Sequence, residues 1–213
     1  MGYCAYHSIQ NVIKLDENVR VANDSQSEFR NLLLRLRNGN STLDDWNILN
    51  SRSTIGTDIS NLGTKYIYLA YSNKVVNEYN LTFLKQSRES IYPIKAKHSS
   101  VKAAKLSSDQ FGGLESLIHL AVNARVMLTR NLWVQKGLCN GSMGTVSQII
   151  YKEGDTPPSL PIAVMVKLDS YNGPTFEDTG FIPIVPVLSS TDDNLERIQI
   201  PLRLSWAITS HRD

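Results

Sequence analysis

Basic and aromatic side chains are mixed in one stretch of this sequence. Between Lys65 and Lys105, eight lysines and arginines stand against only two acids, Glu78 and Glu89. Cations neutralise phosphates, and aromatic rings stack on bases without reading their order. The stretch therefore has the composition of a surface that holds single-stranded nucleic acid, although helix and strand spacing also suits most of its rings to a protein core. These rings belong to Tyr66, Tyr68, Tyr71, Tyr79, Phe83 and Tyr92.

Ser72 and Asn73, within this stretch, have the side-chain types and the position to meet a phosphate. They follow a predicted strand over 66–70 and open a predicted helix, for which the Ser72 hydroxyl is a suitable cap. The free backbone amides at such a turn attract anions. We therefore expect Ser72 and Asn73 to bind nucleic acid.

Asn140-Gly141 is a strong signal for a tight turn. Both residue types tolerate a positive φ, so the pair predicts a hairpin between two strands. Gly137 and Gly144 on either side would let the backbone approach another surface closely. From these residues alone, a plain structural hairpin is a better interpretation than a binding loop.

Several other kinds of chemistry lack the residues they need. Cys4 and Cys139 are isolated, and no CxxC pair is present, so the sequence supports neither a disulfide framework nor a zinc site. His7, His98 and His119 have no spacing typical of metal ligands. No stretch matches GxxxxGK[ST], the loop that holds nucleotide phosphates. The sequence thus predicts no metal site and no nucleotide cradle of its own.

Charge is distributed unevenly although the net charge is only +2. The segment 152–196 contains two lysines and eight acids, the reverse of the basic stretch before it. Such asymmetry indicates two structural units with different neighbours. No apolar run is long enough to span a bilayer, so we expect no membrane partner. The two isolated thiols fit an intracellular location.

The first part of the chain alternates helices and strands. Ser25 with Glu28, and Thr42 with Asp45, have the spacing of capping boxes that begin helices. Asn38-Gly39 is a stop signal for the first of these helices. The other expected elements here are strands over 12–15 and 66–70, a helix that buries Val75, Val76, Tyr79, Phe83 and Leu84, and a loop over 95–113 with room for one extended piece.

After residue 114 the pattern changes to short strands at regular spacing, which indicates a small barrel. The end of the chain returns to alternating strands and helices, with a strand followed by a helix that begins in 204–209. A barrel inserted into an α/β domain would give this order. The expected strands cover 117–120, 124–128, 144–151, 162–168, 181–187 and 198–202.

The sequence resembles the Pif-one (petite integration frequency) family of superfamily-one DNA helicases, including the helicase portion of Helitron-type transposons. The most specific block is ARVMLTRNLWVQKGLCNGSMGTV, residues 124–146. Asn123 stands where the family has glycine, and asparagine tolerates the left-handed backbone that glycine adopts there. Further similar blocks are KLDENVRV, EFRNLLLRLRNGN, YLAYSNKVVNEYN, VKLDSYNGP, FIPIVPV and IPLRLSWAITSHRD.

The resemblance implies a RecA-like (P-loop NTPase-type) second motor domain of α/β class with an inserted small SH3-like β-barrel. Residues 1–125 would form the first part of the motor domain and residues 126–197 the barrel. Residues 198–213 would return to the motor domain, which is truncated because the family pattern His-Lys-Ser-Gln-Gly does not continue after His211. The first motor domain, with its Walker A and B motifs, would be missing from this chain.

The resemblance also assigns roles to residues. Arg20 would be catalytic, because the family's arginine at this motif reaches the γ-phosphate of ATP and stabilises charge in the transition state. A surface arginine is the alternative. His211 would face DNA, unless it is only a frayed terminal residue. The remaining DNA-binding residues would be Thr129, Arg130, Asn131, Asn140 and Gly141.

The implied function is that of a C-terminal fragment of an ATP-dependent 5′-to-3′ helicase acting on single-stranded DNA in repair, recombination or telomere maintenance. ATP and Mg²⁺ would be cofactors of the complete enzyme, the partners would be single-stranded DNA and the first motor domain, and the location would be nuclear or mitochondrial. We expect this chain alone to bind neither cofactor and to be inactive. The alternatives are a non-catalytic module that binds single strands or a protein, and an incomplete gene model or transposon relic.

Overall fold

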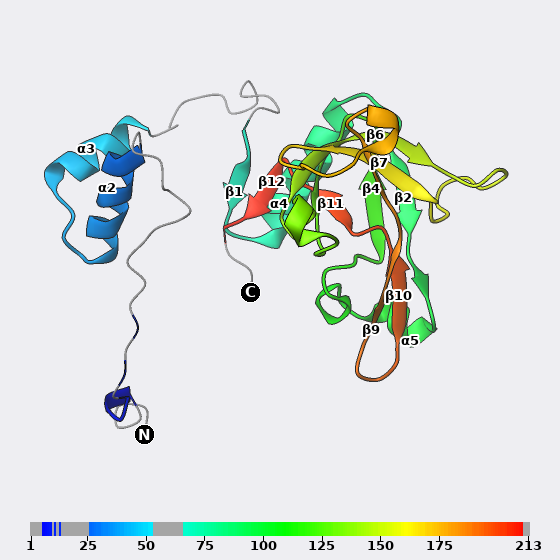
Figure 1. The fold of residues 1–213 in the computed structure, drawn as a ribbon, viewed down its shortest axis with the longest axis horizontal. Helices are drawn as coiled ribbons and strands as arrows, with labels where there is room; N and C mark the ends of the chain where they lie inside the picture. Colours follow the sequence, from blue (N-terminus) through cyan, green and yellow to red (C-terminus); the bar gives the residue numbers. More distant parts are fainter. Residues whose placement is uncertain (1–5, 10, 12, 14–25, 53–65, 211–213) are drawn as a thin grey trace. The chain divides into compact units, whose positions relative to one another are not determined.

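The computed structural model describes residues 6–9, 11, 13, 26–52 and 66–210, and the chain divides into two compact units, Met1–Ile59 and Ser60–Asp213 (Figure 1). Each unit is described by itself. Most of the strand predicted over 12–15 lies outside the described residues.

The first unit contains two helices, α2 (Ser27–Arg37) and α3 (Leu43–Ser51). The capping box predicted for α3 is confirmed, because Thr42 Oγ1 accepts from the Asp45 amide (3.2 Å) and the Asp45 carboxylate accepts from the Thr42 amide (2.9 Å). The hydrogen bond from Arg35 and these capping bonds lower the pKa of Asp45. Ser25, the residue predicted to begin the other box, lies outside the described residues, and the N-cap of α2 is Gln26, which makes no side-chain capping bond.

In the second unit, a parallel pair of strands packs against one helix. Strand β1 (Tyr68–Ala70) pairs with β12 (Ala207–Thr209), and α4 (Asn73–Gln86) lies beside them (Figure 1). The helix predicted to begin in 204–209 is therefore wrong. The apolar residues of this segment instead form β12, which pairs with β1 and is therefore extended.

Strand β1 does not have the burial that its apolar sequence predicts. Leu69 is 67% exposed, although a strand of a parallel sheet is ordinarily covered on both faces. In the described part of the chain, β1 has β12 as its one paired strand. On the covered side, the ring of Tyr68 stacks on Tyr79 of α4, and Phe83 stacks on the buried Trp206.

An antiparallel sheet of five strands, in the order β11-β5-β6-β7-β8, forms the centre of the second unit. Most of its strands match the predicted ones within two residues. Gly144 is needed in β6, because a Cβ there would lie 2.5 Å from the carbonyl oxygen of Lys167 on β7. The five strands are β5 (Arg125–Leu128), β6 (Met143–Ile150), β7 (Ala163–Leu168), β8 (Ile182–Ile184) and β11 (Leu202–Leu204).

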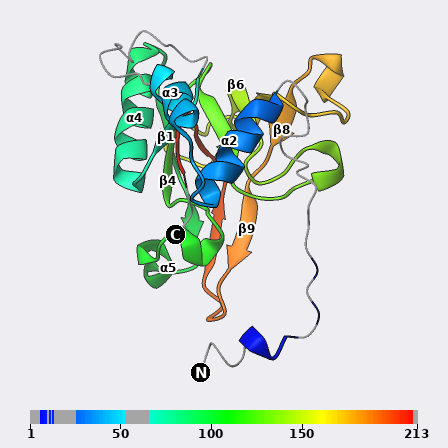
Figure 2. The same ribbon diagram turned by 90° about the vertical axis from the view of Figure 1, so that its left-hand side faces the viewer.

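Two smaller sheets complete the unit, and in Figures 1 and 2 the strands β9 and β10 extend as an arm with α5 beside them. The loop predicted over 95–113 is wrong in part, because Ser100 caps a short helix there that buries Ala103. Asn123 has a φ of 64°, the left-handed conformation expected of it. One of the two sheets consists of β2 (Tyr92–Lys95) and β4 (Leu117–Leu120). The other has the order β3 (Lys97–His98), β10 (Glu196–Gln199) and β9 (Val187–Ser190). The remaining elements are α5 (Val101–Lys105) and the 3-10 turns Asp109–Phe111, Val134–Lys136 and Phe176–Asp178.

The base of this arm is built around Arg197, which is 0% exposed. Its guanidinium donates to the carbonyl oxygens of Leu114 (2.7 Å), Leu106 (2.8 Å) and Ala103 (3.1 Å) and lies 4.2 Å from the ring centroid of Phe111. Burial lowers the pKa of Arg197. Carbonyl oxygens and an aromatic face therefore stabilise this cation, whose hydrogen-bond partners among the described residues include no carboxylate.

His98 lies against this buried cation, and we expect it to make stability depend on pH. The Nε of Arg197 donates to Nδ1 of His98 (3.4 Å), which requires that nitrogen to be unprotonated. Burial, and then the charge of Arg197, lower the pKa of His98. The unfolded chain thus binds the proton more readily, so the free energy of unfolding falls as the pH drops below about 6.5.

Urea unfolding of the chain between about pH 7 and pH 5 measures this effect. In His98→Gln the slope over this interval should become shallower, because the titrating group is gone. An unchanged slope in the variant would show that His98 does not contribute.

One hydrophobic core connects the strands with α4. It includes Leu84 of α4, Ile94 of β2, Val146 of β6 and Trp206 before β12. The boundaries predicted at 125/126 and 197/198 stay predictions. Among the described helices, none is both long and apolar enough to cross a bilayer.

Candidate nucleic-acid interface

Two clefts in the second unit share one cation, Arg203 of β11. One, the first cleft, has a volume of about 470 Å³ and lies between α4 and β4. The other, the terminal cleft, has a volume of about 330 Å³ and lies where the β5–β6 loop (residues 129–142) meets the end of β12. The lining of the terminal cleft consists of Met127, Asn140, Gly141, Arg203, Ile208, Thr209 and Ser210.

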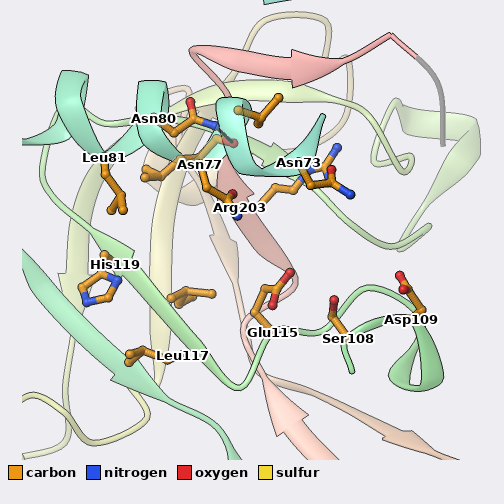
Figure 3. A pocket seen from close by; sticks show the side chains of 13 residues that line it. Asn73, Asn77, Asn80, Leu81, Ser108, Asp109, Glu115, Leu117, His119 and Arg203 are labelled. Carbon is orange, nitrogen blue, oxygen red and sulfur yellow. Dashed lines mark hydrogen bonds between the residues drawn. The ribbon is translucent and has the colours of Figure 1, made fainter. Parts of the chain in front are cut away.

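The first cleft carries acidic side chains. Figure 3 shows Asn73, Asn77 and Asn80 along α4 on one side and Ser108, Asp109 and Glu115 on the other, with Arg203 between them. Two carboxylates beside one guanidinium disfavour a phosphate in this cleft.

The terminal cleft has a different character, because the described residues that line it supply a guanidinium, amides and hydroxyls but no carboxylate. Arg203 is the charged residue, and Asn140, Thr209 and Ser210 supply groups that donate hydrogen bonds. Cations, hydroxyls and amides are the usual protein contacts to a nucleic-acid backbone. The terminal cleft is therefore suited to a phosphate.

Strand pairing brings these residues together from distant parts of the sequence. β11 lies antiparallel to β5, so Arg203 is paired with Met127. β12 continues from β11 and lies parallel to β1, and the Ser210 amide donates to the Ala70 carbonyl oxygen (3.1 Å). The residues directly before His211 are thereby held beside the β5–β6 loop.

The turn at Asn140-Gly141 differs from the predicted hairpin. Gly141 has a φ of 96°, but Asn140 is not among the residues with positive φ. The Ser142 amide donates to the Cys139 carbonyl oxygen (2.9 Å), so the pair turns the chain at the end of the long β5–β6 loop. It does not join two strands directly, because the other residues of that loop precede it.

The predicted contacts Thr129, Arg130 and Asn131 lie at the start of the same loop. Thr129 is buried, and Arg130 donates through its Nη2 to the Phe111 carbonyl oxygen (2.7 Å) and to the Ser189 hydroxyl. Asn131 accepts from the Asn140 amide through its side-chain oxygen (2.7 Å). Thr129 and Arg130 thus hold the loop to the core, and their DNA contacts stay predictions.

Ser72 and Asn73 are placed as predicted at the start of α4. Ser72 is the N-cap, and its hydroxyl accepts from the Val75 amide (3.4 Å). Asn73 is exposed and lines the first cleft. These two residues therefore lie on the acidic side of Arg203, apart from the lining of the terminal cleft.

Two residues of this region, Arg203 and Asn80, were not predicted as site residues. Arg203 alternates with Leu202 and Leu204, so a strand with one cation pointing outward was the available signal. The side chain of Asn80 donates to the Ala207 carbonyl oxygen (2.9 Å) and accepts from the Ala207 amide (2.9 Å). Asn80 thus binds β12 as a neighbouring strand would.

The predicted catalytic Arg20 and the predicted DNA-binding His211 both lie outside the described residues. Within the described ranges, no group of three or more histidine, cysteine, aspartate or glutamate side chains is placed to hold a metal ion.

Comparisons with known proteins bear on this interface. Residues 110–149, which include the whole β5–β6 loop, match the family profile described as DNA helicase Pif1, 2B domain. The chain is 33% identical over 96 residues to the ATP-dependent DNA helicase PIF1 of Danio rerio, an alignment that covers 45% of this chain and 13% of that protein. The predicted resemblance to the Pif-one helicases is confirmed, and the matched part is a small fraction of the relative's length.

Solved structures of the same helicases share the fold. Pif1 helicase from Candida albicans matches 94% of this chain and 47% of its own, with a TM-score of 0.63 and 23% identity. Bacteroides Pif1 bound to single-stranded DNA matches 85% of this chain and 39% of its own, with a TM-score of 0.54 and 21% identity. The mixed α/β architecture is therefore that of part of a Pif1 helicase.

Proposed function

We propose that this chain, which is similar to the C-terminal portion of the Pif1 helicases, holds single-stranded DNA in the terminal cleft. Arg203 contacts a phosphate there, and the amides and hydroxyls of Asn140, Thr209 and Ser210 orient the backbone. The observation that carries the proposal is the meeting of these residues in a cleft whose described lining includes no carboxylate.

In a complete enzyme, ATP and Mg²⁺ would bind between this portion and a first motor domain, and hydrolysis would move the strand in the 5′-to-3′ direction. Arg20 would contact the γ-phosphate, because a guanidinium stabilises charge on the transferred phosphoryl group. Related structures support a nucleotide and a single strand as ligands of the complete enzyme. One is described as Bacteroides Pif1 with ADP-AlF4 and another as Bacteroides Pif1 bound to ssDNA.

The proposal also covers the domain organisation of the chain and the location of the protein in the cell. Residues 126–197 would be the inserted SH3-like barrel of a RecA-like second motor domain, and the protein would act in the nucleus or in mitochondria. A non-catalytic module that only holds single strands is the second candidate, and the absence of a GxxxxGK[ST] stretch from this sequence favours it for the chain alone.

Titration of the purified chain with an oligothymidine at several salt concentrations tests the function. We expect binding whose logarithm falls linearly with the logarithm of the salt concentration. Arg203→Gln should weaken binding about tenfold and reduce the slope by about 0.7, the value for one phosphate contact on a single strand. ATP should neither be hydrolysed nor change the affinity.

Lys152→Gln provides the matched control, because it removes one positive charge at an exposed position after β6. It should leave the affinity and the slope nearly unchanged. Equal losses in the two variants would mean that net charge, and not the terminal cleft, determines binding. Robust ATP turnover by this chain would contradict the proposal that ATP binds between this portion and a first motor domain.

A further inference from the structure

The β5–β6 loop presents a large aromatic side chain to solvent. Trp133 is 44% exposed, and its neighbours Leu132 and Val134 are exposed as well. Tryptophan is ordinarily buried over most of its surface, so its exposure on a binding loop indicates an interaction site.

The loop that carries Trp133 is fixed by its own hydrogen bonds. The Trp133 amide donates to the Leu138 carbonyl oxygen (3.1 Å), and the Leu138 amide donates to the Trp133 carbonyl oxygen (3.0 Å). Gly137 has a φ of 90° and packs so closely on the loop after β7 that a Cβ would lie 2.6 Å from the Ser170 carbonyl oxygen. The backbone at Trp133 is thus held in place, which lowers the entropy cost of using its ring for binding.

The ring of Trp133 has no aromatic or cation–π partner among the residues that the structure describes, whereas Tyr68, Tyr79, Phe83 and Trp206 stack with one another in the interior. The exposed part of the indole is therefore available to a planar ligand. Nucleobases of every kind have such a face.

Charge around the loop favours a polyanion. The segment 129–142 contains Arg130 and Lys136 but neither aspartate nor glutamate. The bond between the Asn131 side chain and the Asn140 amide joins the start of the loop to the lining of the terminal cleft (2.7 Å). A strand whose phosphate lies at Arg203 would thus meet the same loop that carries Trp133. A purely apolar protein partner would not need this charge.

We infer that Trp133 is a stacking platform for a base of the single strand whose backbone the terminal cleft holds. This assignment rests on the proposed function and adds to it the group that grips the bases. Arg203 contributes through charge, whereas Trp133 contributes through a flat apolar surface, so the two contacts respond to different changes in the ligand.

Two oligonucleotides of about twelve residues, one oligothymidine and one abasic with the same backbone, separate these contacts in equilibrium titrations. The wild-type chain should bind the oligothymidine more tightly. Trp133→Ala should weaken oligothymidine binding about tenfold while the abasic affinity stays unchanged. Trp133→Phe should retain most of the preference, because a smaller ring still stacks. Leu132→Ala, which removes an exposed apolar side chain from the same loop, should change neither affinity.

Circular dichroism verifies that each variant keeps the wild-type fold. Unchanged oligothymidine binding by Trp133→Ala would overturn the stacking role and leave the proposed function standing. An equal loss for both oligonucleotides would overturn it too, since the effect would not depend on bases. If Trp133→Ala loses self-association but keeps its DNA binding, the stacking role is also overturned, because the ring would then contact a second copy of the chain. If the wild-type chain binds neither oligonucleotide, both the proposed function and the stacking role fail.

Discussion

Replacement of Arg197 by methionine should lower the free energy of unfolding by about 3–5 kcal/mol. Methionine fills part of the space but donates no hydrogen bond, so the carbonyl oxygens of Leu114, Ala103 and Leu106 lose a buried partner. Arg197→Lys should be intermediate, because an ammonium keeps the charge but cannot reach all of these oxygens. Urea unfolding followed by circular dichroism measures the difference.

Arg125→Gln is the matched control for removal of an arginine. Arg125 pairs with Asp169, whose side chain is 48% exposed, and such pairs contribute up to about 1 kcal/mol. A loss from Arg197→Met no larger than the loss from Arg125→Gln would show that Arg197 does not organise the base of the arm.

Replacement of Asn80 by alanine should cost about 2–4 kcal/mol and should also weaken DNA binding. The amide and the carbonyl oxygen of Ala207 are fully buried, and each would lose its hydrogen bond to the Asn80 side chain. β12, which leads to Thr209 and Ser210 in the terminal cleft, would then be less firmly held. Hydrogen exchange at the Ala207 amide should accelerate in the variant.

Asn77→Ala, one helical turn earlier in α4, tests whether this loss is specific. Asn77 is exposed and lines the first cleft, but among the described residues no hydrogen bond joins its side chain to β12. It should leave the Ala207 exchange rate unchanged. Retained protection of Ala207 in Asn80→Ala would mean that β1 alone holds β12 in place.

Local signals predicted the elements whose stability is local. The capping box of Thr42 with Asp45 and the cap of α4 at Ser72 agree with the structure, because each depends on neighbouring residues. The strand 117–120 also agrees, because its apolar residues suit a buried strand, although its partner β2 lies earlier in the chain. The helix expected within 204–209 failed because the pairing of β12 with β1 involves a partner far away in sequence. The short helix α5 was missed for the same reason. It packs against Arg197, which lies much later in the sequence.

The candidate site could be predicted only in part for a similar reason. Asn140 and Gly141 were found from turn chemistry, and they do line the terminal cleft. Arg203 was missed because its importance comes from two clefts that the sheet order creates. Arg130 was expected to meet DNA because it is a cation in a distinctive block, yet its guanidinium donates to Phe111 and Ser189. Sequence gives the type of a side chain, whereas distant pairings decide which way it points.

The unequal surroundings of Arg203 affect how fast a charged ligand arrives. Asp109 and Glu115 stand on one flank of the guanidinium, while the described residues that line the other flank include no acid. An incoming anion is repelled along the first route and attracted along the second, so productive collisions come from one direction. Added electrolyte screens both effects, and the association rate constant should therefore fall more steeply with ionic strength than the dissociation rate constant rises.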